Sequence, residues 1–236
     1  MDDNKFHAIG RISPRKEGYA RVTGRERYVS DVSLPNMLNA RVLRSPYPHA
    51  KIVSIDTREA EKLGAVCISY HDIPQIKYNE RQVSIPEKTY RDRTVLPDKV
   101  RQVGEGVVAV AAKTEALVDK ALKRIVVKFE PLPAVFDPYE AMQESAPVLY
   151  EDIMLGDKVL PIQQNIACFR EVGEGDVAKG FAEADLVVEN EFKTGRVYHG
   201  QMESKAVVCR PEADGGITVW PTTQSIHNTR QLLGRI

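Results

Sequence analysis

The sequence of 236 residues is poor in cysteine, in aromatic residues and in long apolar runs. Its three cysteines, Cys67, Cys168 and Cys209, lie far apart and form no Cys-x-x-Cys pair. This argues against a disulfide framework and against a self-contained zinc or iron–sulfur site, and it suits a reducing cytoplasm. The five histidines do not pair at metal-ligand spacing either, so we expect no metal bound by protein ligands alone.

Neither sign of charge is in excess, since 33 basic residues offset 33 acidic ones. The chain as a whole therefore has no field to attract a nucleic acid or an anionic membrane. The longest apolar run, Val107 to Ala112, is far short of the roughly 20 residues that cross a bilayer. The N-terminus has no apolar core typical of a secretory signal. We expect a cytoplasmic protein with no nucleic-acid or membrane partner.

The first half of the sequence predicts an α+β or α/β domain. Residues 45–49 carry two prolines, which forbid a continuing helix and fix an extended corner. Thr114 is expected to cap a helix through Lys123 whose apolar residues follow a core-facing stripe. The strand candidates are Tyr28–Val32, Leu38–Leu43, Ile52–Ile55, Val107–Ala112 and Ile125–Phe129.

Residues 131–165 predict a linker that lies over the surface, because prolines interrupt both helices and strand ladders. A second unit is expected from residue 166. Asp176 is placed to cap a short helix, and Leu186–Tyr198 alternates between apolar and polar residues like a strand. Ala206–Arg210 and Ile217–Trp220 predict a hairpin. The linker prolines are Pro131, Pro133, Pro138, Pro147 and Pro161.

The end of the sequence carries the candidate ligand site. His199, Gln201 and Glu203 follow one another at period two, so in an extended strand they point to the same side. They are either a salt-bridged structural corner or support for a ligand pocket. Gln224 ends a predicted strand just before a helix cap, where its amide either donates to a ligand or caps the neighbouring turn. For both groups, the residues alone do not decide between a structural role and a role in ligand binding.

Several motifs occur in a characteristic order along the chain. They are residues 18–32 (Gly-Tyr-Ala-Arg-Val-Thr-Gly-Arg-Glu-Arg-Tyr-Val-Ser-Asp-Val), Arg44–Ala50 with Ile55-Asp56, Val103–Glu105 with 114–133, Gly175–Phe181, His199–Glu203 and Trp220–Gln224. In this order they resemble the molybdenum-binding subunit of the xanthine dehydrogenase and aldehyde oxidase family of molybdenum hydroxylases. One departure is Leu63–Val66, where the family has a Pro-Gly-Val turn.

The resemblance implies an α+β fold in which an α/β-hammerhead domain precedes the first part of a molybdopterin-binding α+β domain. The expected boundaries are 1–17 for an N-terminal arm, 18–130 for the hammerhead domain, 131–165 for the proline-rich linker, and 166–236 for a truncated cofactor domain. Gln224 matches the family's Gln that hydrogen-bonds the molybdenum centre. Glu203, with His199 and Gln201, is expected to support the pocket. No catalytic residue of the family matches this chain.

In such a family the complete enzyme hydroxylates a purine, another N-heterocycle or an aldehyde with water. It passes electrons to [2Fe–2S] clusters and FAD on partner subunits or domains. The resemblance implies molybdenum–molybdopterin in the complete protein and none bound by this segment alone. The implied partners are the rest of the molybdenum subunit, iron–sulfur and FAD subunits, and a small-molecule substrate. A homo-oligomer stays open, and the substrate is not determined. The alternative is a non-catalytic assembly or scaffold domain with no cofactor role.

Overall fold

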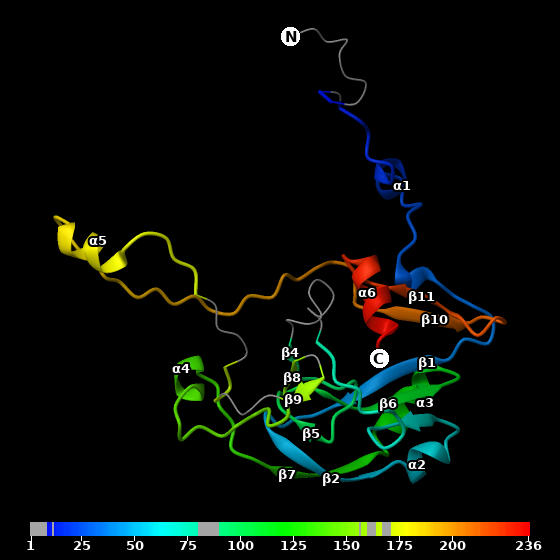
Figure 1. The fold of residues 1–236 in the computed structure, drawn as a ribbon. Helices are drawn as coiled ribbons and strands as arrows, with labels where there is room; N and C mark the ends of the chain where they lie inside the picture. Colours follow the sequence, from blue (N-terminus) through cyan, green and yellow to red (C-terminus); the bar gives the residue numbers. More distant parts are fainter. Residues whose placement is uncertain (1–8, 11, 80–89, 156, 160–163, 167–170) are drawn as a thin grey trace. The chain divides into compact units, whose positions relative to one another are not determined.

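The computed structural model describes residues 9–10, 12–79, 90–155, 157–159, 164–166 and 171–236 (Figure 1). Cys168 and most of the first half of the expected N-terminal arm lie outside these residues. The chain divides into two compact units, and each is described by itself. The larger unit comprises Asn36–Arg196 and His227–Ile236, and the smaller comprises Met1–Pro35 and Val197–Ile226. Both combine helices and strands, as the α+β prediction requires.

The core of the larger unit is built around β6 (Gly106–Ala112), at the predicted buried run. β6 is the central strand of a three-stranded antiparallel sheet, between β1 (Asn39–Arg44) and β3 (Val66–Ile68). Val107 and Val108 are both fully buried although they point to opposite faces. A strand covered on both faces needs a continuous apolar run rather than an alternating one, which explains the sequence of β6.

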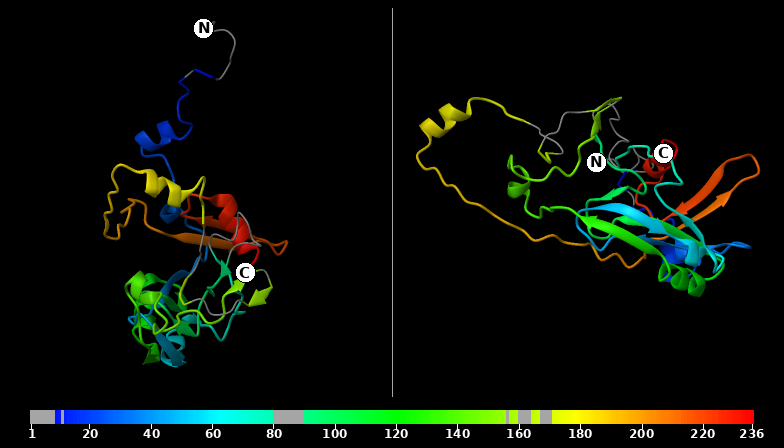
Figure 2. Two further views of the ribbon diagram at one scale, coloured as in Figure 1. Left: turned by 60° about the vertical axis from the view of Figure 1, so that its left-hand side comes forward. Right: turned by 90° about the horizontal axis from the view of Figure 1, so that it is seen from below.

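Two helices pack with this sheet (Figures 1 and 2). α3 (Glu115–Leu122) lies against β6 and β1, and α2 (Arg58–Glu61) lies against α3 and β3. α3 begins as predicted, because the Thr114 hydroxyl oxygen accepts a hydrogen bond from the Leu117 N–H at 3.2 Å. Val118 is fully buried and anchors the apolar stripe of α3 in the core.

A second three-stranded sheet has the order β5-β2-β7. Its strands are β5 (Lys99–Val100), β2 (Ala50–Asp56) and β7 (Val126–Pro131). The predicted two-proline corner separates β1 from β2 and is fastened at both ends. The Ser45 N–H donates to the Glu105 carbonyl at 2.9 Å, and Nδ1 of the buried His49 donates to the Pro133 carbonyl at 2.6 Å. The corner thereby holds the two sheets to one core.

Residues 131–165 are more regular than the linker prediction suggests. They contain the short helix α4 (Pro138–Ala141), and β8 (Met154–Leu155) and β9 (Lys158–Val159), which form a small sheet with β4 (Tyr90–Arg91). Pro138 occupies the first turn of α4, where a missing N–H costs nothing. The two short strands lie between Pro147 and Pro161, in a stretch without proline.

The smaller unit contains the predicted hairpin of β10 (Val207–Pro211) and β11 (Ile217–Pro221). Gly215 supplies the positive φ of +85° in its turn. The helix α1 (Gly18–Val22) and a 3-10 turn, η1 (Val29–Asp31), precede the hairpin in the chain. The helix α6 (Ile226–Leu233) follows the hairpin in the chain, and from His227 on it belongs to the larger unit.

Outside the candidate site, the strand prediction was wrong for two runs. The run Tyr28–Val32 forms η1, because the Asp31 carboxylate accepts the Tyr28 N–H at 2.9 Å and this local bond competes with an extended conformation. The run Leu186–Tyr198 forms no strand, and its side chains are exposed on both faces. Alternation alone does not make a strand when, among the described residues, no other strand pairs with it.

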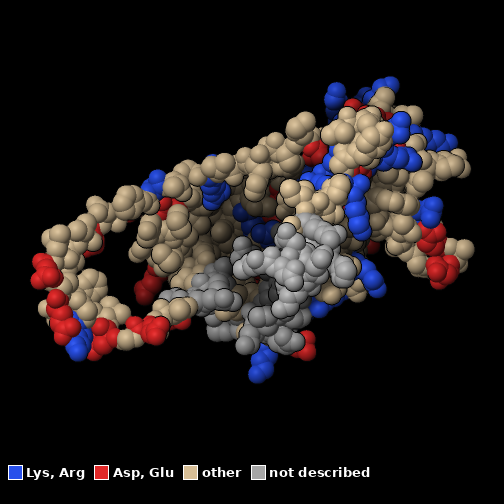
Figure 3. Space-filling model, turned by 90° about the horizontal axis from the view of Figure 1, so that it is seen from above, with Lys and Arg blue, Asp and Glu red and all other residues tan. Residues whose placement is uncertain are grey.

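The helix before that run was predicted correctly. α5 (Val177–Glu183) begins where the Asp176 carboxylate accepts the Lys179 N–H at 2.9 Å. Residues 171–191 around α5 carry seven acidic side chains and one basic one, and red side chains gather along this segment at the left of Figure 3. In the described part of the chain, no helix combines the length and apolarity that a membrane span requires.

Candidate functional site

The hairpin brings the two candidate runs next to each other through Thr222. The Thr222 N–H donates to the Ala206 carbonyl at 2.9 Å, which extends the β10–β11 pairing by one step. The Thr222 hydroxyl oxygen accepts the Ala206 N–H at 3.2 Å, and the hydroxyl donates to the Ser204 carbonyl at 3.2 Å. The segment that follows Glu203 is therefore bonded to a residue two positions before Gln224.

Thr222 is the residue of this site that sequence reasoning overlooked. It belongs to the Thr222-Thr223-Gln224 run, in which only Gln224 was predicted to bind a ligand. The signal was present, because a threonine just beyond a strand end can use its hydroxyl where the backbone ladder stops.

The segment from His199 to Glu203 differs from the prediction. It is not an extended strand, since Gly200 takes a positive φ of +61° and a bend follows at Met202 and Glu203. His199, Gln201 and Glu203 therefore do not share one face through strand alternation. His199 and Gln201 are exposed, and the Gln201 amide donates to the Tyr198 hydroxyl at 3.0 Å.

Glu203 and Gln224 have side chains that are free to bind a ligand. Glu203 is half-buried and Gln224 is exposed. Within the part of the chain that the structure describes, neither side chain makes a hydrogen bond or an ion pair. The Gln224 amide thus does not cap the neighbouring turn here, and the Glu203 carboxylate does not belong to a salt-bridged corner.

The charged groups at the turn of the hairpin, by contrast, are paired with one another. Arg210 donates to the Glu212 carboxylate at 2.8 Å, and its guanidinium lies 5.5 Å from the centre of the Trp220 ring. The Thr218 hydroxyl also donates to Glu212. The hydroxyl first, and then Arg210, lower the pKa of Glu212 below its ordinary value. These groups are engaged in stabilising the hairpin and are not free to bind a ligand.

The unpaired groups suit a polar organic ligand better than a bare metal ion. Among the described residues, no group of three or more His, Cys, Asp or Glu side chains could hold a metal. Gln224 instead offers two amide N–H donors and one carbonyl acceptor without adding charge. This donor set fits the polar ring and oxygen atoms of an organic cofactor that carries its own metal ligands.

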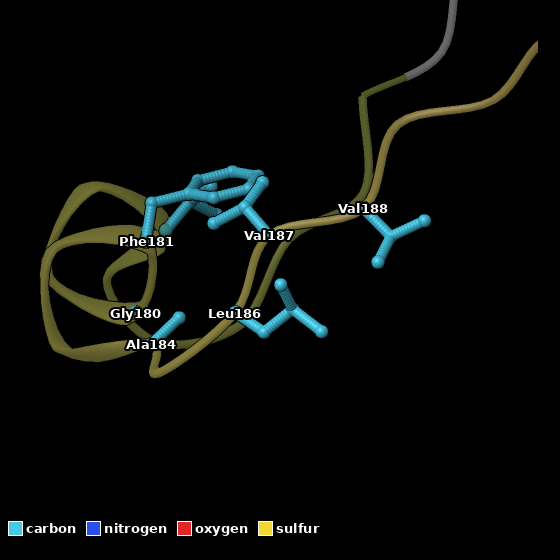
Figure 4. Close-up of a pocket in the computed structure, with 7 residues that line it drawn as sticks. Gly180, Phe181, Ala184, Leu186, Val187 and Val188 are labelled. Atoms are coloured by element: carbon cyan, nitrogen blue, oxygen red, sulfur yellow. The ribbon is translucent and has the colours of Figure 1, made fainter.

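The hollow at α5 is of a different kind. It has a volume of about 370 Å³ and lies between α5 and the segment that follows it (Figure 4). All of its lining side chains are apolar, so they offer neither a proton donor nor a proton acceptor. The lining residues are Val177, Gly180, Phe181, Ala184, Leu186, Val187 and Val188. None of the predicted site residues belongs to it.

Replacing Thr222 by valine is expected to loosen the junction that carries the site. The substitution keeps the shape but removes the hydroxyl that bridges Ala206 and Ser204, which costs about 1–2 kcal/mol of local stability. Amide hydrogen exchange at Ala206 should become faster, and Thr222→Ser, which keeps the hydroxyl, should restore it. Unchanged exchange in Thr222→Val would show that the backbone pairing alone holds the junction.

Comparison with known families identifies two domains along the chain. Residues 23–133 match the family model for the a/b hammerhead domain of aldehyde oxidase and xanthine dehydrogenase. Residues 160–236 match the model for the molybdopterin cofactor-binding domain. The second match includes the hairpin, Glu203 and Gln224.

Individual relatives agree with these matches. The chain is 36% identical to a probable xanthine dehydrogenase subunit of Bacillus subtilis, over 94% of this chain and 28% of that protein. It is 31% identical to the nicotinate dehydrogenase large molybdopterin subunit of Eubacterium barkeri, over 95% of this chain and 49% of that protein. The chain thus spans between about a quarter and a half of the length of these relatives.

Solved structures show the same fold. A Cu,Mo-CO dehydrogenase superposes with a TM-score of 0.78 at 29% identity, over 94% of this chain and 28% of that one. Quinoline 2-oxidoreductase from Pseudomonas putida 86 superposes with a TM-score of 0.72, also at 29% identity, over 89% of this chain and 26% of that one.

Proposed function

Because this chain belongs to the aldehyde oxidase and xanthine dehydrogenase family of molybdenum hydroxylases, we propose that it supplies the hammerhead domain and one wall of the molybdopterin site. The complete protein then hydroxylates a purine, another N-heterocycle or an aldehyde with water. Electrons pass to iron–sulfur clusters and flavin on partner subunits or domains. The three well-separated cysteines favour a reducing cytoplasm as its location.

One observation supports this role most directly. The unpaired Gln224 amide lies just beyond β11, and Thr222 bonds that strand end to the segment after Glu203. The molybdenum–molybdopterin cofactor, when bound, would supply the redox centre of the hydroxylation. Gln224 would hold it by donating a hydrogen bond, and Glu203 would support the wall of the pocket. Neither residue is assigned a proton-transfer step.

The wall described here is open. Gln224, His199 and Gln201 are exposed, so the 236-residue chain alone offers little to exclude water from a bound cofactor. We therefore propose that this segment by itself retains no stable molybdopterin and has no turnover. The residues that orient the substrate and act as general base would come from the part of the family's cofactor subunit that this chain does not match.

Metal analysis and substrate oxidation test the proposal in two preparations. The complete protein, purified from its own cells, should contain molybdenum and should oxidise at least one of xanthine, nicotinate and an aromatic aldehyde. The 236-residue chain should contain none and oxidise none. A complete protein without molybdenum would refute the function, and near-stoichiometric molybdenum with turnover in the 236-residue chain would refute the open-wall argument alone.

A further inference from the structure

Among the described residues, three ion pairs join the connector between the two family domains to the hammerhead domain. Residues 149–155 and 157–159 of this connector, here called the strap, contain β8 and β9. Its acidic residues pair with cations from three separate segments of the hammerhead domain. The pairs are Asp152 with Lys77 at 2.5 Å, Glu151 with Lys99 at 2.6 Å, and Asp157 with Arg91 at 3.7 Å.

The two partners of each pair differ in burial. The side chains of the three cations are between 12% and 19% exposed, whereas those of the three acids are between 51% and 107% exposed. Removing an acid would thus leave a largely buried cation without a partner, which is more costly than losing an exposed pair. Lys99 raises this cost further, because its ammonium group contacts both oxygens of the Glu151 carboxylate, at 2.7 and 2.6 Å.

Arg101 adds a fourth point of attachment. Its Nε donates to the Leu149 carbonyl at 2.6 Å, and its guanidinium lies 4.7 Å from the centre of the Tyr150 ring. The same guanidinium donates to the Lys99 carbonyl at 2.9 Å, so Arg101 is fixed to β5 while it holds the strap. The bonds from Lys99 and Arg101 fall on the first three residues of the strap.

In the described part of the chain, the backbone contributes little to this attachment. Among these residues β8 pairs with β4 through two residue pairs, Tyr90 with Leu155 and Arg91 with Met154. Ladders this short are marginal without side-chain support. In addition, no described residue of the strap is buried, in contrast to β6, so the strap contributes no residue to the buried core.

We propose that the strap is an electrostatic latch. It holds the connector on the hammerhead domain and fixes the point from which the chain continues into the cofactor domain. The latch opens by loss of the acid–cation contacts, while the β6 core stays folded. This role is independent of molybdopterin and of the reaction.

Hydrogen exchange measured by mass spectrometry on the complete protein tests the latch. The double variant Glu151→Gln and Asp152→Asn keeps the side-chain shapes and removes both charges. Peptides covering residues 149–155 should exchange at least five- to tenfold faster, because even an exposed pair stabilises the closed state by roughly a factor of three and these cations are largely buried. Peptides from β6 should be unchanged. About 0.5 M sodium chloride should accelerate exchange of the same peptides in the wild type by a smaller factor, because salt screens pairs with largely buried cations only in part.

Two controls make the result specific. Asp119→Asn removes an ion pair of similar length, Arg41–Asp119 at 2.6 Å, from the hammerhead surface and should leave the strap unchanged. The charge swap Lys99→Glu with Glu151→Lys should restore slow exchange that either single change loses. The proposal is refuted if exchange in 149–155 is the same in the double variant and the wild type. It is also refuted if β6 accelerates equally, since the strap would then open only by global unfolding.

Discussion

Gln224→Ala in the complete protein is expected to lower molybdenum content, turnover, or both by about 10- to 100-fold. The reason is that the Gln224 amide makes no hydrogen bond in the described part of the chain and is positioned next to the Thr222 junction. If the Gln224 amide donates to the molybdenum–molybdopterin group, the alanine variant removes that hydrogen bond and puts no other donor in its place. Metal analysis and steady-state kinetics on the same preparation measure both quantities.

Two further variants test whether the effect depends on the amide donor of Gln224 or on the volume of its side chain. Gln224→Glu keeps the size but replaces the donor with a carboxylate, so it should be at least as damaging as alanine. Gln231→Ala, in the exposed part of α6, removes another glutamine amide and should leave content and turnover near wild type. If Gln224→Ala and Glu203→Ala both matched the wild type, this segment would instead be a scaffold without a cofactor role.

Val108→Asp is expected to unfold the hammerhead domain. Val108 is fully buried in the central strand β6, where a carboxylate would have no access to water. Burying such a group costs several kcal/mol, on top of the packing that the valine loses. Because domains of this kind have a total stability of about 5–15 kcal/mol, most of the folded state should be lost. Urea denaturation followed by circular dichroism measures the change.

Val66→Asp is the matched control for that substitution. Val66 lies in β3, pairs directly with β6 opposite Ala111, and is 54% exposed. Its carboxylate would reach water, so the loss should stay below about 1 kcal/mol. Equal destabilisation by the two variants would mean that strand propensity, rather than burial, decides the stability of this sheet.

The sequence predicted those elements that are stabilised by contacts between residues close to one another in the chain. Thr114 and Asp176 cap α3 and α5 because a side-chain oxygen reaches an N–H three residues on, which needs no other part of the chain. The β10–β11 hairpin forms because its turn supplies Gly215. The same signals failed at Leu186–Tyr198, where alternation was present but, among the described residues, a partner strand was not.

The sequence by itself thus determined the family, the buried run of β6 and the identity of Gln224 as the candidate ligand residue. Only the tertiary structure decided how Glu203 is placed, because Gly200 breaks the expected strand and Thr222 bonds the segment after Glu203 to the end of β11. The tertiary structure also showed that the proline-rich connector is bonded to the hammerhead domain by ion pairs. The acids and cations of the strap are separated by about 50 to 75 positions in the chain, so no local pattern could pair them.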